Sequence, residues 1–181
     1  MDEPSWLDPD ESRAWRGWLV MSEMLRTAIA RDMMAESGLS EADYHVLAHL
    51  SEAAGHRLRM HDLASRLDWS RSRLSHQVAR MEARRLVCRE GCPTDARGAL
   101  AVLSAAGLAE IERAAPHHVG SVRRHLIDLL DRDQVLELAA IAEKVVSRLR
   151  EQGQPAECEG ATPVCGGPAA ARAGDDLAFP V

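Results

Sequence analysis

The chain is poor in aromatic residues and in long apolar runs. Aromatic side chains make up 3% of its 181 residues, so a core has to be built from Leu, Ala, Val, Ile and Met. No apolar run approaches the roughly 18–20 residues that a membrane-spanning helix needs. The acidic N-terminus also lacks the architecture of a signal peptide. We therefore expect a cytoplasmic protein with no membrane partner.

Cysteine is also scarce. Four cysteines in a chain of this length, without a secretion signal, do not predict a disulfide framework. Cys88 and Cys92 have C-x3-C spacing, but no second pair with metal-ligand spacing lies near them, so we expect no structural zinc site. Basic residues beside these two thiols could lower a thiol pKa, which leaves a redox role open. Cys158 and Cys165 lie in the C-terminal tail and suggest no role.

No pattern of residues predicts an enzyme. The sequence has no Ser/His/Asp ordering, no phosphate-binding glycine loop and no metal motif of specific spacing. His45 and His49 lie four residues apart on one predicted helix, and His117, His118 and His125 form a second group. We interpret both groups as exposed or interface histidines in preference to a metal site or a pH sensor. We predict no catalytic residue, no metal and no cofactor.

Charge is distributed unevenly along the chain. The sequence holds 22 basic and 28 acidic residues, for a net charge of −6. Between Arg57 and Leu100, however, ten arginines stand against five acidic residues, so this stretch carries +5 and the remainder −11. A basic island in an acidic protein is typical of a surface that binds a polyanion.

The basic stretch has the periodicity of two short helices joined by a turn. Apolar residues recur at helical spacing in both, at Met60, Leu63, Ala64 and Leu67, and at Leu74, Val78, Met81, Leu86 and Val87. Each helix therefore has one face to bury. Asp68-Trp69-Ser70 forms the turn between them, and Ser70 is a typical N-cap. A hairpin with a charged tip follows, and this order of elements predicts a winged helix-turn-helix that reads DNA.

The second helix has a polar face suited to DNA. Its side chains can hydrogen-bond phosphates and base edges. Ser70 is placed to bond a phosphate at the helix start, and Arg73 or Arg71 is our candidate for a bidentate contact to guanine. Arg97, at the hairpin tip, is expected to enter the adjacent minor groove. The remaining candidates on the exposed helix face are Ser72, Ser75, His76, Gln77 and Arg80, the last of these for the DNA backbone.

Helices flank this DNA-binding domain on both sides. The long first helix has apolar residues on more than one face, which suggests that it packs against a partner subunit as well as its own domain. The C-terminal helices are expected to pair with it across a dimer axis. The expected segments are an irregular N-terminus over 1–9, a dimerisation helix over 10–36, the DNA-binding domain over 37–104, dimerisation helices over 105–151 and a disordered tail over 152–181.

Several short motifs point to one family. They are Leu63-Ala64-Ser65-Arg66-Leu67, Ser70-Arg71-Ser72, Arg85-Leu86-Val87 and the wing sequence Asp95-Ala96-Arg97-Gly98, followed by Val102-Leu103-Ser104 and Gly107. Over roughly Trp15 to Arg150 the chain resembles the MarR family of winged helix-turn-helix transcription regulators. Arg85 is a departure, because the family often has Gly there and a left-handed helix end is strained for Arg.

The resemblance implies a fold that is mainly α with a small β-wing, in a homodimer held by the N- and C-terminal helices. It also implies repression by binding a palindromic operator. Many members lose DNA affinity when a phenolic or other aromatic anion binds. Asp95 would hold Arg97 or the wing turn in place, as the matching residue does in the family.

Two other functions stay open for this scaffold. A thiol-based redox-sensing regulator would use Cys88 and Cys92 to distort the wing. A protein-interaction module without DNA binding would not need Arg97 or the arginine-rich helix, and their presence speaks against it. We therefore predict a DNA-binding repressor released by a small-molecule effector.

Overall fold

The structure, a computed structural model, describes residues 5–92 and 95–153, and for residues 92 and 95–98 it describes the backbone alone. The chain divides between Leu126 and Ile127 into two compact units. The predicted irregular N-terminus over 1–9 and disordered tail over 152–181 lie largely outside the described residues. Within those residues, 5–8 have no helix or strand, whereas residue 9 and residues 152–153 are helical, contrary to the predicted bounds.

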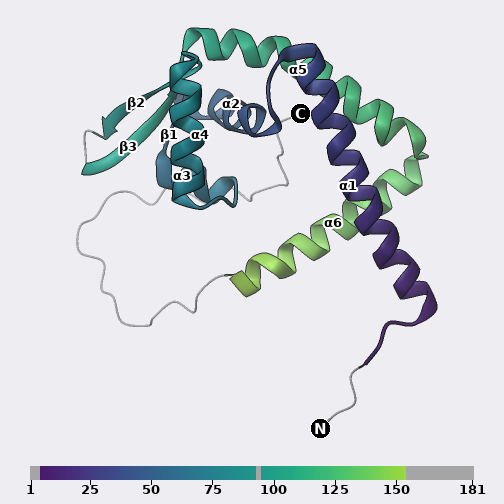
Figure 1. Cartoon of the computed structure of the whole chain (residues 1–181). Coiled ribbons are helices and arrows are strands. Elements are labelled where there is room, and N and C mark those ends of the chain that lie inside the picture. Colours follow the sequence, from purple (N-terminus) through teal and green to yellow (C-terminus); the bar gives the residue numbers. More distant parts are fainter. Residues whose placement is uncertain (1–4, 93–94, 154–181) are drawn as a thin grey trace, which may run out of the picture. The chain divides into compact units, whose positions relative to one another are not determined.

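The first unit contains the helix-turn-helix, the wing and the helices around them (Figure 1). They run in the order α1 (Pro9–Ser37), α2 (Glu41–Glu52), the short 3-10 helix η1 (Ala54–His56), β1 (Arg57–Arg59), α3 (Met60–Arg66), α4 (Arg71–Ala83), β2 (Val87–Cys92), β3 (Asp95–Leu103) and α5 (Ala105–His125). In the second unit the described elements are η2 (Ile127–Leu129) and α6 (Arg132–Gly153). The mainly α fold with a small β-wing is confirmed.

α1 begins and ends on strong local signals. The Asp8 side chain accepts hydrogen bonds from the backbone of Asp10 and Glu11, and the Glu11 side chain accepts one from Asp8 N, which forms a capping box ahead of Pro9. Gly38, with a left-handed φ of 69°, ends the helix. No helix in the described part of the chain is long and apolar enough to cross a membrane.

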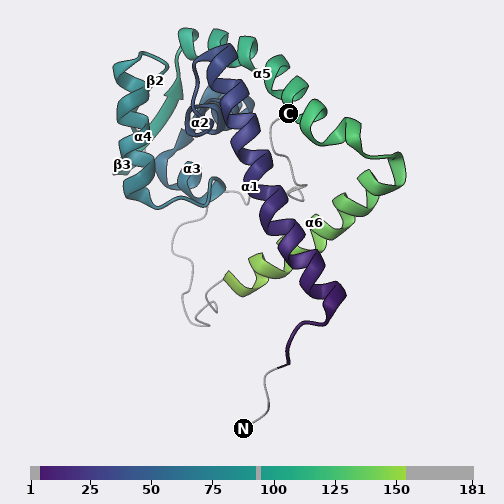
Figure 2. The same cartoon turned by 45° about the vertical axis from the view of Figure 1, so that its right-hand side comes forward.

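α1 packs along α5, as both cartoon views show (Figures 1 and 2). The two helices are joined by Asp32, whose Oδ2 lies 2.8 Å from each of Ser121 Oγ, Arg124 Nη2 and His125 Nε2. These three hydrogen bonds, of which the one from Arg124 has the largest effect, hold the pKa of the Asp32 carboxyl well below its ordinary value. α1 is thereby fixed to α5 through a charged contact.

The core lies between α2, α3, α4 and the sheet. α2 starts at a capping box in which Ser40 and Asp43 exchange hydrogen bonds. Its inner face is apolar, and the helix-turn-helix covers it. The buried residues include Tyr44, Leu47 and Leu50 of α2, Leu63 of α3, and Leu74, Val78 and Met81 of α4. The expected buried positions Leu63, Ala64, Leu74, Val78 and Met81 are confirmed. Met60 and Leu67 are only partly buried. The placement of Leu86 and Val87 on the second helix is wrong, because that helix ends at Ala83 and Val87 begins β2, although both residues are buried.

The wing is a three-stranded antiparallel sheet in the order β1-β3-β2. Leu58 pairs with Ala101, and Cys88 pairs with Val102. Cys88 and Cys92 both belong to β2, with Cys92 as its last residue. Arg85, two residues before β2, has φ 60°, so Arg takes the left-handed conformation that the resemblance led us to expect at this position.

Candidate nucleic-acid interface

α4 is the helix that carries most of the predicted DNA contacts. Its N-cap is Ser70, whose Oγ accepts a hydrogen bond from Arg73 N at 3.2 Å. One side of the helix is buried, and the other is exposed. The exposed residues are Arg71, Ser72, Arg73, Ser75, His76 and Arg80, together with Ser70 at the cap. The structure thus brings these predicted residues together on one face, while their contacts to DNA stay a prediction.

Gln77 is the exception, because the expectation that it lies on the exposed face is wrong. It is only 3% exposed, and its Nε2 donates to Asp43 Oδ1 at 2.8 Å. The reason is helical spacing, since residue 77 lies three after Leu74 and four before Met81 on the buried stripe. Applying the same i, i+3, i+4 rule to its polar side chain would have placed it correctly.

Asp43 connects α2 to α4 and was not among the predicted site residues. Besides Gln77, it accepts from Arg84 Nη1 at 2.7 Å and from the N and Oγ of Ser40. Arg80 in turn donates to the Gln77 side chain. Burial alone would raise the pKa of Asp43, but hydrogen bonds from Ser40 and Arg84 hold it below its ordinary value. Asp43 therefore stays ionised and holds the side of α4 nearest α2.

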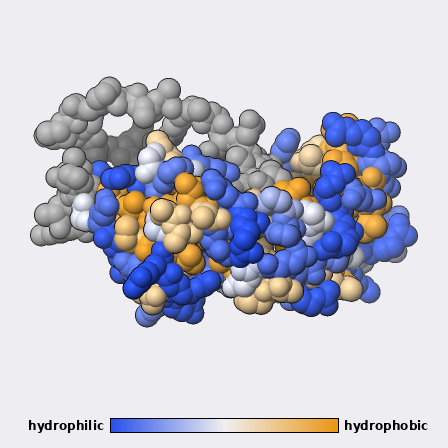
Figure 3. Space-filling view, turned by 90° about the horizontal axis from the view of Figure 1, so that it is seen from above, coloured by the Kyte–Doolittle hydropathy of each residue, from blue (hydrophilic) through white to orange (hydrophobic). Residues whose placement is uncertain are grey.

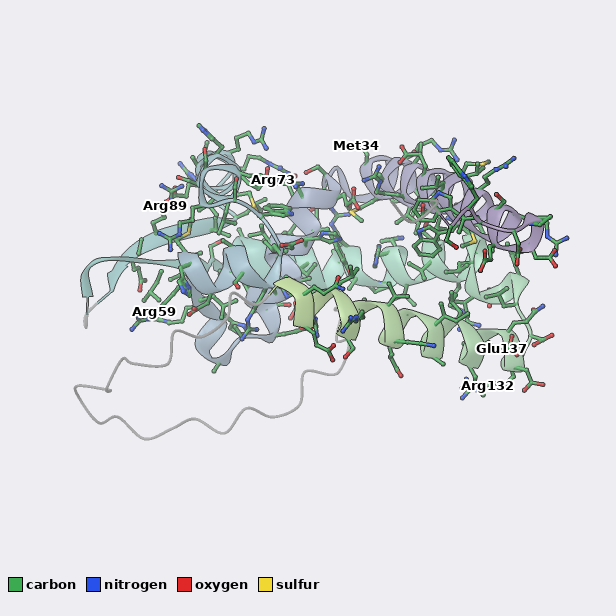
Figure 4. All side chains as sticks on the ribbon, turned by 90° about the horizontal axis from the view of Figure 1, so that it is seen from below. Met34, Arg59, Arg73, Arg89, Arg132 and Glu137 are labelled. Atoms are coloured by element: carbon green, nitrogen blue, oxygen red, sulfur yellow. The ribbon has the colours of Figure 1, made fainter. Side chains whose placement is uncertain are left out.

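Arg89 connects the wing to α4. Its Nη2 donates to the Ser75 carbonyl at 2.6 Å, its Nε lies 3.3 Å from Glu82 Oε2, and its backbone N donates to Glu82 Oε1 at 3.0 Å. Figure 4 shows Arg89 with Arg73 at the winged part of the molecule. Sequence reasoning gave Arg89 no structural role. The base of the wing is thereby held in a fixed position against α4.

The wing tip carries two further predicted residues, Asp95 and Arg97. Both belong to β3, and Asp95 pairs in register with Cys92, but their side chains lie outside the described part. Their roles stay predictions. Cys88 has a free, exposed thiol on β2, whereas the Cys92 side chain is outside the described part, so the redox alternative also stays a prediction.

The rings of His45 and His118 lie close to that of the buried Tyr44. The His118 ring centroid is 4.3 Å from that of Tyr44, and its Nδ1 is buried with no hydrogen-bond partner among the described residues. Burial lowers the pKa of His45, His49 and His118. The charge of His45 lowers the pKa values of His49 and His118 further. Within residues 5–92 and 95–153, no three His, Cys, Asp or Glu side chains form a group that could hold a metal ion.

These lowered pKa values make stability depend on pH. An unfolded His has a pKa of about 6.5, so below that pH the unfolded chain binds more protons than the folded one. The free energy of unfolding should therefore be highest above about pH 6.5 and fall as the pH drops toward the folded-state values. Urea titrations across this range should show the fall, and His118→Gln should reduce it.

A control separates the buried histidines from exposed ones. His61 is exposed and pairs only with the neighbouring Asp62 among the described residues. His118→Gln should reduce the pH dependence more than His61→Gln does. A pH dependence that is the same in His118→Gln as in the unaltered protein would contradict the assignment to His118.

Comparisons with known proteins agree with this geometry. The profile of the MarR family matches residues 37–98. AbsC, a MarR family transcriptional regulator from Streptomyces coelicolor, is 44% identical with a TM-score of 0.78, over 82% of this chain and 100% of its own. Sco3205, a MarR family regulator from the same organism in complex with DNA, is 35% identical with a TM-score of 0.77, over 88% of this chain and 98% of its own.

A more distant structure agrees in fold alone. The MepR–DNA complex from S. aureus is 18% identical, with a TM-score of 0.64 over 81% of this chain and 99% of that one. No curated protein matches the sequence. With the helix-turn-helix and the wing at the residues that the sequence indicated, the chain belongs to the MarR family of transcriptional regulators.

Proposed function

We propose that this MarR family regulator is a sequence-specific repressor that binds a palindromic operator as a homodimer and is released by a small aromatic anion. The observation that carries the proposal is the arginine-bearing face of α4, exposed above a buried opposite face and held beside the wing by Arg89. A helix of this kind fits the major groove of DNA. The similar Sco3205 has been captured in complex with DNA, which supports the same partner here.

The residues of the interface divide into positioning and reading roles. Ser70 at the N-cap binds a phosphate, because the free N–H groups of a helix start favour an anion. Arg71 or Arg73 reads a guanine, and Arg97 enters the minor groove with Asp95 supporting the wing turn. Ser72, Ser75 and His76 add base or phosphate contacts. Arg80, further along α4 and bonded to Gln77, contacts the DNA backbone.

The homodimer is supported by apolar side chains that the single chain leaves uncovered. Trp15 and Trp18 of α1 are each about half exposed, as are Leu136 and Val145 of α6. Figure 3 shows apolar side chains lying exposed among hydrophilic ones on the face seen from above. Large exposed apolar side chains along a helix favour an interface with another subunit, and a two-fold dimer matches the symmetry of a palindromic operator. The effector rests on family membership alone.

The experiment is operator binding by the purified protein, on DNA from its own upstream region, across a salt series. Arg97→Ala should weaken binding by about tenfold or more and lower the salt slope by about one, because one minor-groove cation is lost. Arg148→Ala is the matched control, since Arg148 is an exposed arginine of α6 that pairs only with Glu151 among the described residues.

Two outcomes decide the proposal. Tight, salt-dependent binding that Arg97→Ala weakens and Arg148→Ala does not would support it, and would make a screen of aromatic anions the next step. Absent or salt-insensitive binding by a folded dimer would contradict it and favour a protein-interaction module.

A further inference from the structure

We propose that Trp69 is a positioning residue that determines DNA specificity by holding Arg73 ready to read a base. The inference rests on the proposed DNA-binding function and deepens it. It concerns a tryptophan in the turn of the helix-turn-helix, which none of the contacts assigned above includes.

The scaffold fixes the indole of Trp69. Trp69 lies directly before the N-cap Ser70, after Asp68 with its left-handed φ of 50°. Its backbone N donates to Ala64 O of α3 at 2.9 Å, and its partly buried side chain packs against the core. The ring is therefore held by α3 and the core, at the start of α4, and has little freedom to move.

Arg73 lies on this ring. Its Cζ is 4.2 Å from the centre of the Trp69 ring, well within the range of a cation–π contact. The backbone of Arg73 is fixed as well, because its N–H donates to Ser70 Oγ. Both ends of the side chain are thus restrained, which reduces the conformational entropy that binding would remove. Figure 4 labels Arg73 on this helix.

The hydrogen-bonding edges of Arg73 remain available. Its guanidinium makes no hydrogen bond or salt bridge with any residue in the described ranges, whereas Arg80, Arg84 and Arg89 are bonded to Gln77, Asp43 and Glu82 respectively. A guanidinium held by its face keeps its N–H donors free for a bidentate contact to guanine O6 and N7. Arg73 combines a fixed position with unused donors, as a base-reading side chain requires.

Arg71 provides a matched comparison. It is exposed on the first turn of the same helix, but the described residues provide no aromatic ring against it. If the contact between Arg73 and the Trp69 ring contributes to DNA binding, the effect of removing the ring should depend on the presence of Arg73 and not on the presence of Arg71. A double-mutant cycle measures this difference directly.

The experiment measures dissociation constants of the full-length protein for an operator, selected by the unaltered protein from random duplexes, and for a scrambled duplex. Trp69→Leu should weaken operator binding by about fivefold while leaving scrambled DNA unaffected. In the Arg73→Ala background the same substitution should have almost no effect. In the Arg71→Ala background it should keep its full fivefold effect.

A second variant guards against loss of folding, since Trp69 also packs on the core. Trp69→Phe keeps an aromatic ring in that place, with a weaker cation–π contact, and should give an intermediate loss of specificity at unchanged thermal stability. The inference is overturned if the loss is equal with and without Arg73, or if removing the ring tightens operator binding. No sequence-specific binding by the unaltered protein would instead overturn the proposed function and this inference with it.

Discussion

Replacing Gly107 with alanine is expected to destabilise the DNA-binding domain by at least about 3 kcal/mol. A Cβ at this position would lie 2.0 Å from the Leu86 carbonyl oxygen and 2.9 Å from Leu103 Cδ1. The nearest atom belongs to the backbone and not to a flexible side chain, so the overlap can be relieved only by separating α5 from the segment before β2. A loss of this size is a large part of the 5–15 kcal/mol that stabilises a typical domain.

The same carbonyl supports the junction between the wing and α5. Leu86 O accepts from Ser104 N at 3.1 Å and from Ser104 Oγ at 3.0 Å. Moving α5 away from Leu86 would weaken both bonds, together with the Ser104 cap of the helix. We therefore expect the substitution to disturb the wing as well as the core.

Chemical denaturation followed by circular dichroism would measure the effect. Gly120→Ala is the matched control, because it lies in the same helix and nothing lies within 4 Å of the Cβ that it would add. It should stabilise the protein by up to about 1 kcal/mol through helix propensity. Equal stability of Gly107→Ala and the unaltered protein would show that the close approach to Leu86 is not real.

Local patterns explain how much of this molecule could be predicted. Helical periodicity located α4 and its buried apolar residues Leu74, Val78 and Met81, and the N-cap at Ser70 located its start. The MarR family expectation of a left-handed residue identified Arg85, which has φ 60°. Each of these signals lies within a few residues of the feature that it predicts.

Contacts between distant residues were not predictable in this way. Gln77 bonds to Asp43 across 34 positions, and Arg89 reaches the Ser75 carbonyl across 14. Neither spacing has a periodic signature, and Asp43 already had a sufficient local role in its capping box. A polar residue on a predicted buried stripe, such as Gln77, is the one sequence signal that points to such a contact, because buried polar groups need partners.

The second large effect is expected at Asp43, where alanine should lower the free energy of unfolding by about 2–4 kcal/mol. Two losses contribute. The first is the capping box at the start of α2, which is worth about 1 kcal/mol. The second is the hydrogen-bond partner of Gln77, because leaving its buried amide unsatisfied costs about 1–3 kcal/mol. Asp43 is only 4% exposed, so water cannot readily replace the lost carboxylate. Arg84 is less affected, because its side chain is 45% exposed.

A second substitution tests whether Asp43 and Gln77 act as a pair. Gln77→Leu removes the amide that needs a partner, so adding it to Asp43→Ala should recover most of the second loss. Denaturant titrations of the two single variants and the double variant provide the coupling between them. If the stability changes of the two single variants simply add in the double variant, the hydrogen bond from Gln77 to Asp43 does not link α2 to α4. Coupling would show that the recognition helix is held in place by a buried carboxylate, so that operator affinity should fall in Asp43→Ala even where the domain remains folded.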